Sequence, residues 1–138
     1  MKFFLRIFLF LALSLSALHA DEFRDISSVS LKKDEVKKIL VKYGSVSKLF
    51  KFRWTLYKND GLIIHRSYDR VVAQNILYLR YKNESFRVVL KPKGADYYKV
   101  PYLLVQFKKF DFEKNEAIFE LLLSDKSMSV NLKHLNNN

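Results

Sequence analysis

The stretch that decides the fold is FKFRWTLYKNDGLIIHRSY, residues 50–68. On both sides of its centre, apolar residues alternate with polar ones, and this period of two is typical of half-buried β-strands. The centre is Asn59-Asp60-Gly61, and these residue types tolerate the positive φ angles of tight turns. The stretch is therefore predicted to form a β-hairpin.

The register of this hairpin depends on the length of its loop. A three-residue loop at 59–61, with the glycine in the left-handed conformation, places Leu56 opposite Ile64. A two-residue loop formed by the last two of these residues would place Leu56 opposite His65. We predict the three-residue loop, because it keeps apolar side chains opposite one another on one face of the hairpin.

Residues 82–84 repeat the pattern of a lysine, an asparagine and an acid, and they predict a second turn. A two-residue loop there places Leu77 opposite Leu90, so that one face of the hairpin is apolar throughout. The same register places Arg80 directly opposite Arg87. Like charges that face each other across two strands are unfavourable unless they extend into water or meet an anion, so this pair is a candidate anion site.

Residues 114–116 show the same pattern and predict a third turn, in which a two-residue loop pairs Phe110 with Phe119. The apolar alternation of the preceding strand changes phase near residues 108–109. A β-bulge at that point would absorb the extra residue. We therefore interpret the three triplets as corners between strands and not as a repeated binding motif.

Three successive hairpins indicate a mainly β fold, either a small antiparallel β-sandwich or an open barrel built as a hairpin meander. Residues 32–43 fit a helix or a strand, and we predict a strand because the chain that follows is β. The other predicted strands are 48–57, 62–67, 75–82, 85–91, 102–112 and 116–124, with a short strand near 128–133. The predicted core residues are Phe50, Phe52, Trp54, Leu56, Ile64, Leu77, Leu79, Val88, Leu90, Phe110, Phe119 and Leu121.

The chain begins with the layout of a secretory signal peptide. Lys2 and Arg6 provide a positive start, and residues 7–18 are almost wholly apolar. The small residue Ala20 then precedes two acids. Because the apolar run is short for a membrane span, we predict a cleaved signal peptide at residues 1–20, with an uncleaved anchor as the alternative.

Cleavage would leave residues 21–138 as a single β domain, in which the final HLNNN is predicted to fray. A cleaved signal peptide places such a domain in the periplasm, with secretion as the second choice. Removing the two basic residues of the signal peptide lowers the net charge only from +11 to +9. This charge favours either solubility or attraction to an anionic partner. The lysines are spread along the sequence, and no run is long enough to form a basic tail.

The residue types that carry common enzyme chemistry are scarce. The absence of cysteine excludes disulfides and thiol catalysis. His65 and His134 are the only histidines after the signal peptide, and neither has acidic neighbours at the spacing of a metal site. The sequence also contains no familiar nucleophile or phosphate-loop motif. We therefore predict a protein that is not an enzyme and needs no cofactor or metal.

A second candidate site is LKPKGADYYKVPY, residues 90–102, which interrupts the alternation and contains both prolines. Loops carried by a rigid sheet often hold binding residues, and in this loop lysines are interleaved with tyrosines. Lysines can meet phosphate groups while tyrosines lie on a sugar or acyl surface. Together with the arginine pair, the predicted binding residues are Arg80, Arg87, Lys91, Lys93, Tyr97, Tyr98, Lys99 and Tyr102.

The function that these features predict is that of a non-catalytic, exported interaction module. It would be an accessory to a larger protein assembly of the cell envelope and would dock by strand addition. The alternative is a carrier or binder of anionic lipid or envelope glycan that uses the basic, tyrosine-rich loop. A hydrolase of envelope polymers is a third hypothesis. Nucleic acid is not an expected partner, because no pattern of stacking aromatics appears on a strand. The oligomeric state stays open.

Overall fold

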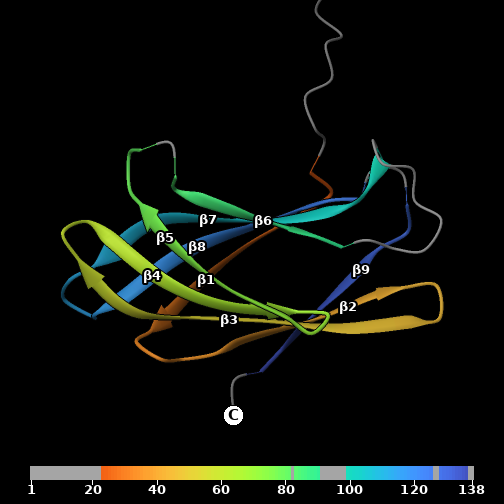
Figure 1. Cartoon of the computed structure of the whole chain (residues 1–138), viewed down its shortest axis with the longest axis horizontal. Coiled ribbons are helices and arrows are strands. Elements are labelled where there is room, and N and C mark those ends of the chain that lie inside the picture. The colour runs from red at the N-terminus through yellow and green to blue at the C-terminus, as the bar shows by residue number, and fades with distance from the viewer. Residues whose placement is uncertain (1–22, 82, 91–98, 126–127, 137–138) are drawn as a thin grey trace, which may run out of the picture.

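The structure is a computed structural model that describes residues 23–81, 83–90, 99–125 and 128–136 (Figure 1). The predicted signal peptide lies outside these residues. Within the described ranges no helix is long and apolar enough to cross a bilayer. The strands, in chain order, are β1 (Asp25–Lys32), β2 (Lys37–Tyr43), β3 (Val46–Lys58), β4 (Gly61–Tyr68), β5 (Val71–Tyr78), β6 (Ser85–Val89), β7 (Tyr102–Asp111), β8 (Glu116–Ser124) and β9 (Asn131–Leu135).

The strands form two antiparallel sheets that face each other across one core (Figure 1). The four-stranded sheet has the order β1-β8-β7-β6, and the five-stranded sheet has the order β5-β4-β3-β2-β9. Neither sheet closes on itself. The predicted mainly β, antiparallel architecture is confirmed. The choice of strand over helix for residues 32–43 is also confirmed, since this segment contains β2.

Large apolar side chains fill the core between the sheets. Alternate residues of β3 point inward, so Phe50, Phe52 and Trp54 are at most 2% exposed. The ring of Phe52 packs edge-on against Phe119 of the four-stranded sheet, with 5.3 Å between centroids. Trp54 Nε1 also donates a hydrogen bond, at 2.7 Å, to the carbonyl oxygen of Leu31, which lies on β1 of the four-stranded sheet. Aromatic packing and one buried hydrogen bond therefore join the two sheets.

The predicted core residues are buried, with two exceptions. Leu79 is half-buried against the core, whereas Leu56 is 45% exposed. Leu56 points outward because the pairing of β3 with β4 shifts between Trp54 and Leu56, which leaves Thr55 as a β-bulge. After the bulge, Tyr57 takes the inward position and packs against the core.

The loop of the first hairpin differs from both alternatives considered for the sequence. Lys58 pairs with Gly61, so the loop is the dipeptide Asn59-Asp60. Both loop residues have positive φ angles, 52° and 62°, as the primed turns of two-residue hairpins require. The predicted left-handed Gly61 is wrong. A Cβ at Gly61 would lie 2.9 Å from the ring of Tyr78 on β5, so this glycine makes room for a neighbouring strand.

The second predicted hairpin does not form. β5 belongs to the five-stranded sheet and β6 to the four-stranded sheet, so the chain passes from one sheet to the other after Tyr78 and before Ser85. The backbone N–H of Tyr78 donates to the carbonyl oxygen of Asn83 at 3.0 Å, which closes this crossing into a turn. Arg80, inside the turn, adopts a φ of 64°. At the second predicted turn the chain thus passes to the other sheet, and it does not reverse within one sheet.

The pairing predicted across this hairpin is therefore wrong for both residue pairs. Arg80 does not lie opposite Arg87, because β6 pairs with β7. Leu77 and Leu90 are likewise not partners on neighbouring strands. Both leucines are nevertheless buried, since strands in opposite sheets turn their apolar faces toward the same core.

The third hairpin has a longer loop than predicted. Asp111 pairs with Glu116, which leaves residues 112–115 as a four-residue loop. The Oδ1 atom of Asp111 accepts hydrogen bonds from the backbone N–H groups of Glu113 and Lys114, both at 3.1 Å. An acceptor side chain at the first position of the turn stabilises this loop.

As a result, Phe110 pairs with Ala117, and the predicted pairing of Phe110 with Phe119 is wrong. The predicted bulge is confirmed, because the register of β7 on β8 shifts between Phe107 and Lys109. This bulge returns Phe110 to the core.

The C-terminal strand β9 pairs with β2, with His134 opposite Ile39. It lies closer to the C-terminus than the strand predicted near 128–133, and it contains the first two residues of the HLNNN tail, whose last two residues lie outside the described residues. Partial burial lowers the pKa of His134. Lys37 lowers it further, while Asp25 opposes this effect.

Candidate anion-binding surface

The structure separates the two arginines of the first predicted site. Arg80 is exposed in the crossing between the sheets, and Arg87 lies on the outer face of β6. The guanidinium carbon of Arg87 lies 3.9 Å from the centroid of the Tyr102 ring. Tyr102 is only 3% exposed and also meets the ring of Phe23 edge-on. Arg87 and Tyr102 therefore lie together, but they pack against each other, and Tyr102 has little surface left for a ligand.

The predicted tyrosine-rich loop is described only near its ends. Lys91, Lys93, Tyr97 and Tyr98 lie outside the described residues. Lys99 is exposed. The backbone N–H of Leu90 donates to the carbonyl oxygen of Pro101 at 2.9 Å, so the two ends of the loop are held side by side.

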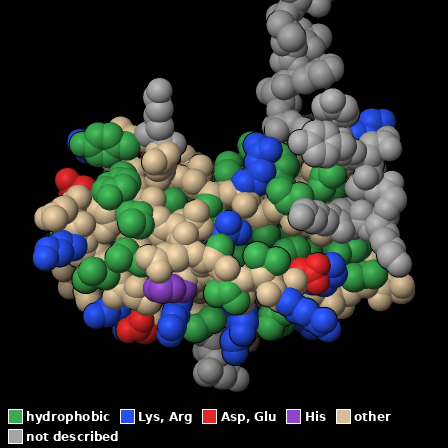
Figure 2. Space-filling model, viewed as in Figure 1, with side chains coloured by type: hydrophobic (Ala, Val, Ile, Leu, Met, Phe, Trp, Pro, Cys, Tyr) green, Lys and Arg blue, Asp and Glu red, His purple; other side chains and the backbone are tan. Residues whose placement is uncertain are grey.

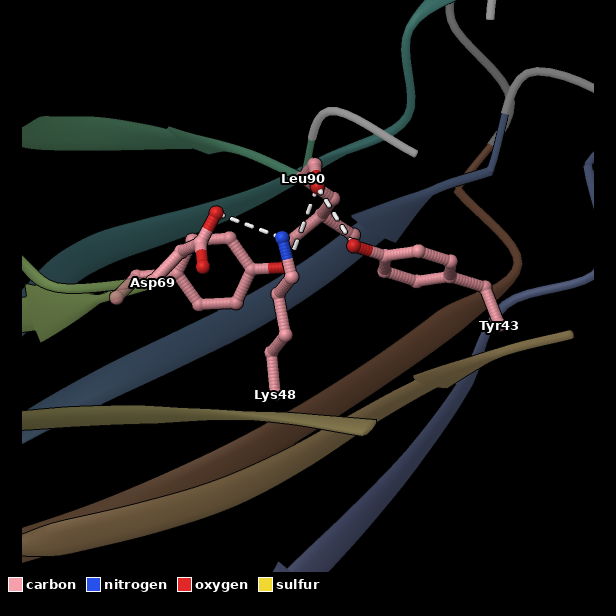
Figure 3. A network of polar contacts seen from close by, with 5 residues as sticks. Tyr43, Lys48, Asp69 and Leu90 are labelled. Atoms are coloured by element: carbon pink, nitrogen blue, oxygen red, sulfur yellow. Dashed lines mark hydrogen bonds and ion pairs between the residues drawn. The ribbon is translucent and has the colours of Figure 1, made fainter. Parts of the chain in front are cut away.

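A polar network fixes one of these ends to the five-stranded sheet (Figure 3). The carbonyl oxygen of Leu90 accepts hydrogen bonds from the hydroxyls of Tyr43 and Tyr68, at 3.4 Å and 3.2 Å. Burial, together with the neighbouring Tyr43 hydroxyl, raises the pKa of Tyr68 far above its usual value. Beside them, Lys48 Nζ lies 2.6 Å from a carboxylate oxygen of Asp69, and this contact raises the pKa of Lys48. The network is structural, since its groups bind one another.

The charges of the molecule are segregated between the two sheets. In the four-stranded sheet, basic and acidic residues balance: Lys32, Arg87, Lys108 and Lys109 against Asp25, Asp111, Glu116 and Glu120. The strands of the five-stranded sheet contain no Asp or Glu at all. Their basic residues are Lys37, Lys38, Lys42, Lys48, Lys51, Arg53, Lys58, Arg66 and Lys133. The positive charge of the described chain is therefore concentrated in one sheet.

Strand alternation turns six of these cations outward. Lys58 is the last residue of β3, and the other five form what we term the basic face: Lys38, Lys42, Lys51, Arg53 and Lys133. All five are exposed, and none forms a hydrogen bond or ion pair with another described residue. Lys38 lies directly opposite Lys51 on the neighbouring strand, an unfavourable arrangement for like charges without a bound anion. Figure 2 shows Lys and Arg side chains along the lower rim of the view, on the side where β3 lies in Figure 1.

Aliphatic side chains share this face with the cations. Leu40 lies opposite Leu49, between the rows that hold Lys38 and Lys42. Leu49 is 38% exposed, and Val72 on the edge strand β5 is 77% exposed. The basic face is therefore mixed, with positive charges and small apolar patches next to each other.

This face is not apparent from the distances between the lysines along the chain. The pattern that could have revealed it is the alternation itself: in KKILVKY and FKFRW, basic residues occupy the positions between buried apolar ones. Basic residues at alternate positions of paired strands share one face whatever their separation in sequence.

Comparison with known proteins finds no matching family model, no similar curated protein and no similar solved structure. Among the described residues, no group of three or more His, Cys, Asp or Glu side chains is placed to hold a metal ion. The basic face and the edges of the sheets are therefore the candidate functional surfaces.

Proposed function

We propose that this protein is a non-catalytic, exported binding module, a β-sandwich that docks through its basic face onto anionic phospholipid at a membrane of the cell envelope. The observation that carries the proposal is the segregation of charge. Five unpaired cations lie on the outer face of a sheet whose strands contain no acid. A periplasmic location, reached through a cleaved signal peptide, would put this face in contact with such membranes.

The mixture of side chains favours a lipid surface over other polyanions. Each Lys or Arg close to an anionic membrane contributes about 1 kcal/mol, so five cations would give about 5 kcal/mol at low salt. Leu40 and Leu49 could lie against the acyl boundary while the lysine stems extend toward the headgroups. Single-stranded nucleic acid would instead need aromatic platforms, and the outward positions of β2, β3 and β9 carry none.

A sedimentation assay with phospholipid vesicles tests the proposal. The purified protein is expected to bind vesicles that contain anionic phosphatidylglycerol, and to bind more weakly as salt rises, because the attraction is electrostatic. Reversing Lys38, Lys42 and Lys133 to Glu is expected to weaken binding at least tenfold.

The matched control reverses Lys32, Lys108 and Lys109 on the four-stranded sheet, which changes the net charge equally. This control is expected to stay within about twofold of the native protein, apart from a small general effect of net charge. Equal losses in the two variants would mean that the basic face has no special role. Failure of the native protein to bind anionic vesicles would rule out the proposal.

Strand addition at β5 is a second candidate function, and it is favoured by the composition of that strand. β5, VVAQNILY, lies at the edge of the five-stranded sheet and contains no charged residue and no proline. Natural edge strands are usually protected by such residues, and β5 is eight residues long. The other edge strands carry charges or are short. β5 is thus the edge best suited to pair with a strand of an envelope protein.

Gln74 provides a direct test of this second candidate. The N–H of Tyr78 points away from β4, since it bonds to Asn83, and by the alternation of antiparallel pairs the N–H of Gln74 points the same way. Gln74→Pro therefore removes an outward donor without breaking the ladder to β4. With a photo-crosslinking residue at Val72, we expect a discrete adduct in cells that persists in Gln74→Ala and disappears in Gln74→Pro. An adduct that survives both changes would exclude pairing at this edge.

A further inference from the structure

We propose that Lys51, Arg53, His65 and Ser67 form a discrete subsite on the basic face that binds a phosphate group carried as a mono- or diester. The inference rests on the proposed function and makes it more specific. It names one place on the sheet where a headgroup phosphate would be held, whereas the other cations of the face attract the membrane by charge alone.

The four side chains are neighbours by strand geometry. Arg53 on β3 lies directly opposite His65 on β4, and Lys51 lies opposite Ser67. Directly opposed residues on antiparallel strands are about 5 Å apart, and alternate residues of one strand are about 7 Å apart. The four groups therefore stand at the corners of a small rectangle on the outer face, with the Phe52–Arg66 pair beneath its centre.

The surface is hollowed at this rectangle. The hollow has a volume of about 360 Å³, which is ample for a phosphate group with part of the alcohol that it esterifies. Val36 and Val72 provide apolar walls, and Val72 is largely exposed. The residues that line the hollow are Val36, Lys51, Phe52, Arg53, His65, Arg66, Ser67 and Val72.

The polar groups at the rim have no partner within the described protein. Lys51, Arg53, His65 and Ser67 form no side-chain hydrogen bond and no ion pair with another described residue. No carboxylate lines the hollow that could neutralise the two cations. Their hydrogen-bonding capacity is therefore available to a ligand.

Arg66 lies beneath the hollow and forms no ion pair with a described acid. Its Nε donates to the amide oxygen of Asn75 at 2.7 Å, and its guanidinium carbon lies 4.9 Å from the centroid of the Phe86 ring. Burial lowers the pKa of Arg66, which still leaves an arginine charged at neutral pH. Both contacts are to neutral groups on the inner side of the sheet, so they hold the Arg66 guanidinium on the side away from the hollow.

The chemistry of the rim suits a phosphate group. A guanidinium donates two parallel hydrogen bonds to phosphate oxygens, and a lysine ammonium adds a compact charge. The serine hydroxyl and an imidazole N–H supply further hydrogen-bond donors. The valine walls suit the glycerol and first methylenes of a lipid.

Amide NMR titration tests the subsite, with inorganic phosphate in one arm and monomeric dihexanoyl-phosphatidylglycerol in the other. We expect saturable shifts confined to residues 51–53 and 65–67. Arg53→Gln is expected to weaken binding at least tenfold. Lys108→Gln removes the same charge from the four-stranded sheet, away from the basic face, and is expected to change affinity less than twofold.

The two arms also identify the source of the phosphate. Tighter binding of the phospholipid would support a subsite for the esterified phosphate of a headgroup, and tighter binding of inorganic phosphate would overturn it in favour of a free anion. Shifts spread over the whole basic face, or equal losses in Arg53→Gln and Lys108→Gln, would overturn the subsite. Vesicle binding that still depends on Lys38, Lys42 and Lys133 would then leave the proposed function standing without it.

Discussion

Urea denaturation of a Trp54→Ala variant is expected to show a loss of about 3–5 kcal/mol in the free energy of unfolding. Trp54 is among the largest fully enclosed side chains, at 2% exposure, and its ring packs edge-on against Phe110 at 5.5 Å. Truncation would open a cavity between the sheets. It would also leave the carbonyl oxygen of Leu31 without its donor. Because domains are stable by only about 5–15 kcal/mol, such a loss would populate the unfolded state under mild conditions.

Two further variants separate the causes of this loss. Trp54→Phe keeps most of the packing but removes the Nε1 donor, and it should cost about 1–3 kcal/mol. Leu56→Ala, on the same strand but 45% exposed, should stay within about 0.5 kcal/mol of the native protein. A loss below about 1 kcal/mol for Trp54→Ala would show that the indole does not join the two sheets as described.

The double variant Tyr43→Phe with Tyr68→Phe is expected to lose about 1–3 kcal/mol of unfolding free energy, more than the sum of the single variants. Each hydroxyl donates to the same carbonyl oxygen of Leu90, so either one alone still satisfies this buried acceptor. Only the double variant leaves the acceptor without a partner. A double-mutant cycle measures this coupling directly from the four unfolding curves.

Tyr81→Phe serves as the control, because its ring is 65% exposed, and it should have little effect. Strictly additive losses in the cycle would contradict a shared acceptor. They would indicate instead that each tyrosine acts through its own separate contacts.

The sequence could predict which segments are strands, because burial of one face imposes a period of two. It could not predict how those strands pair. Leu77 and Leu90 match as well across two facing sheets as they do across one hairpin, since both arrangements bury them. An apolar pattern tells which side of a strand is inside, and it does not tell to which sheet the strand belongs. The sequence therefore did not reveal that the chain passes from one sheet to the other between Tyr78 and Ser85.

Local irregularities account for the other errors. The bulge at Thr55 reverses the sides of Leu56 and Tyr57, and its position depends on how β3 meets β4. The bulge of β7 could be predicted, because Phe107 and Phe110 break the alternation visibly. No comparable break marks Thr55, since both a leucine and a tyrosine can lie on either face.

The basic face was predictable in its parts but not as a whole. The alternation already places Lys51 between the core residues Phe50 and Phe52, and Lys38 directly before the core residue Ile39. Their position opposite each other, however, depends on the pairing of β2 with β3. Lys133 joins them only because β9 returns to lie beside β2, a contact between residues far apart in the sequence. Long-range pairing thus creates the candidate surface, and the sequence alone does not reveal that pairing.

The positions of β1 and β9 also bear on when this chain can fold. β1 pairs with a single strand, β8, so Ile26 cannot form its native pairing until Leu122 is present. Likewise, β2 pairs with β9, which comes from the other end of the chain. Neither sheet can be completed before almost the entire polypeptide has been delivered. Native contacts between such distant segments slow folding, because the chain between them must first be ordered. If the chain is exported as we propose, this topology would keep it unfolded during translocation and let both sheets close only after its last strand has crossed.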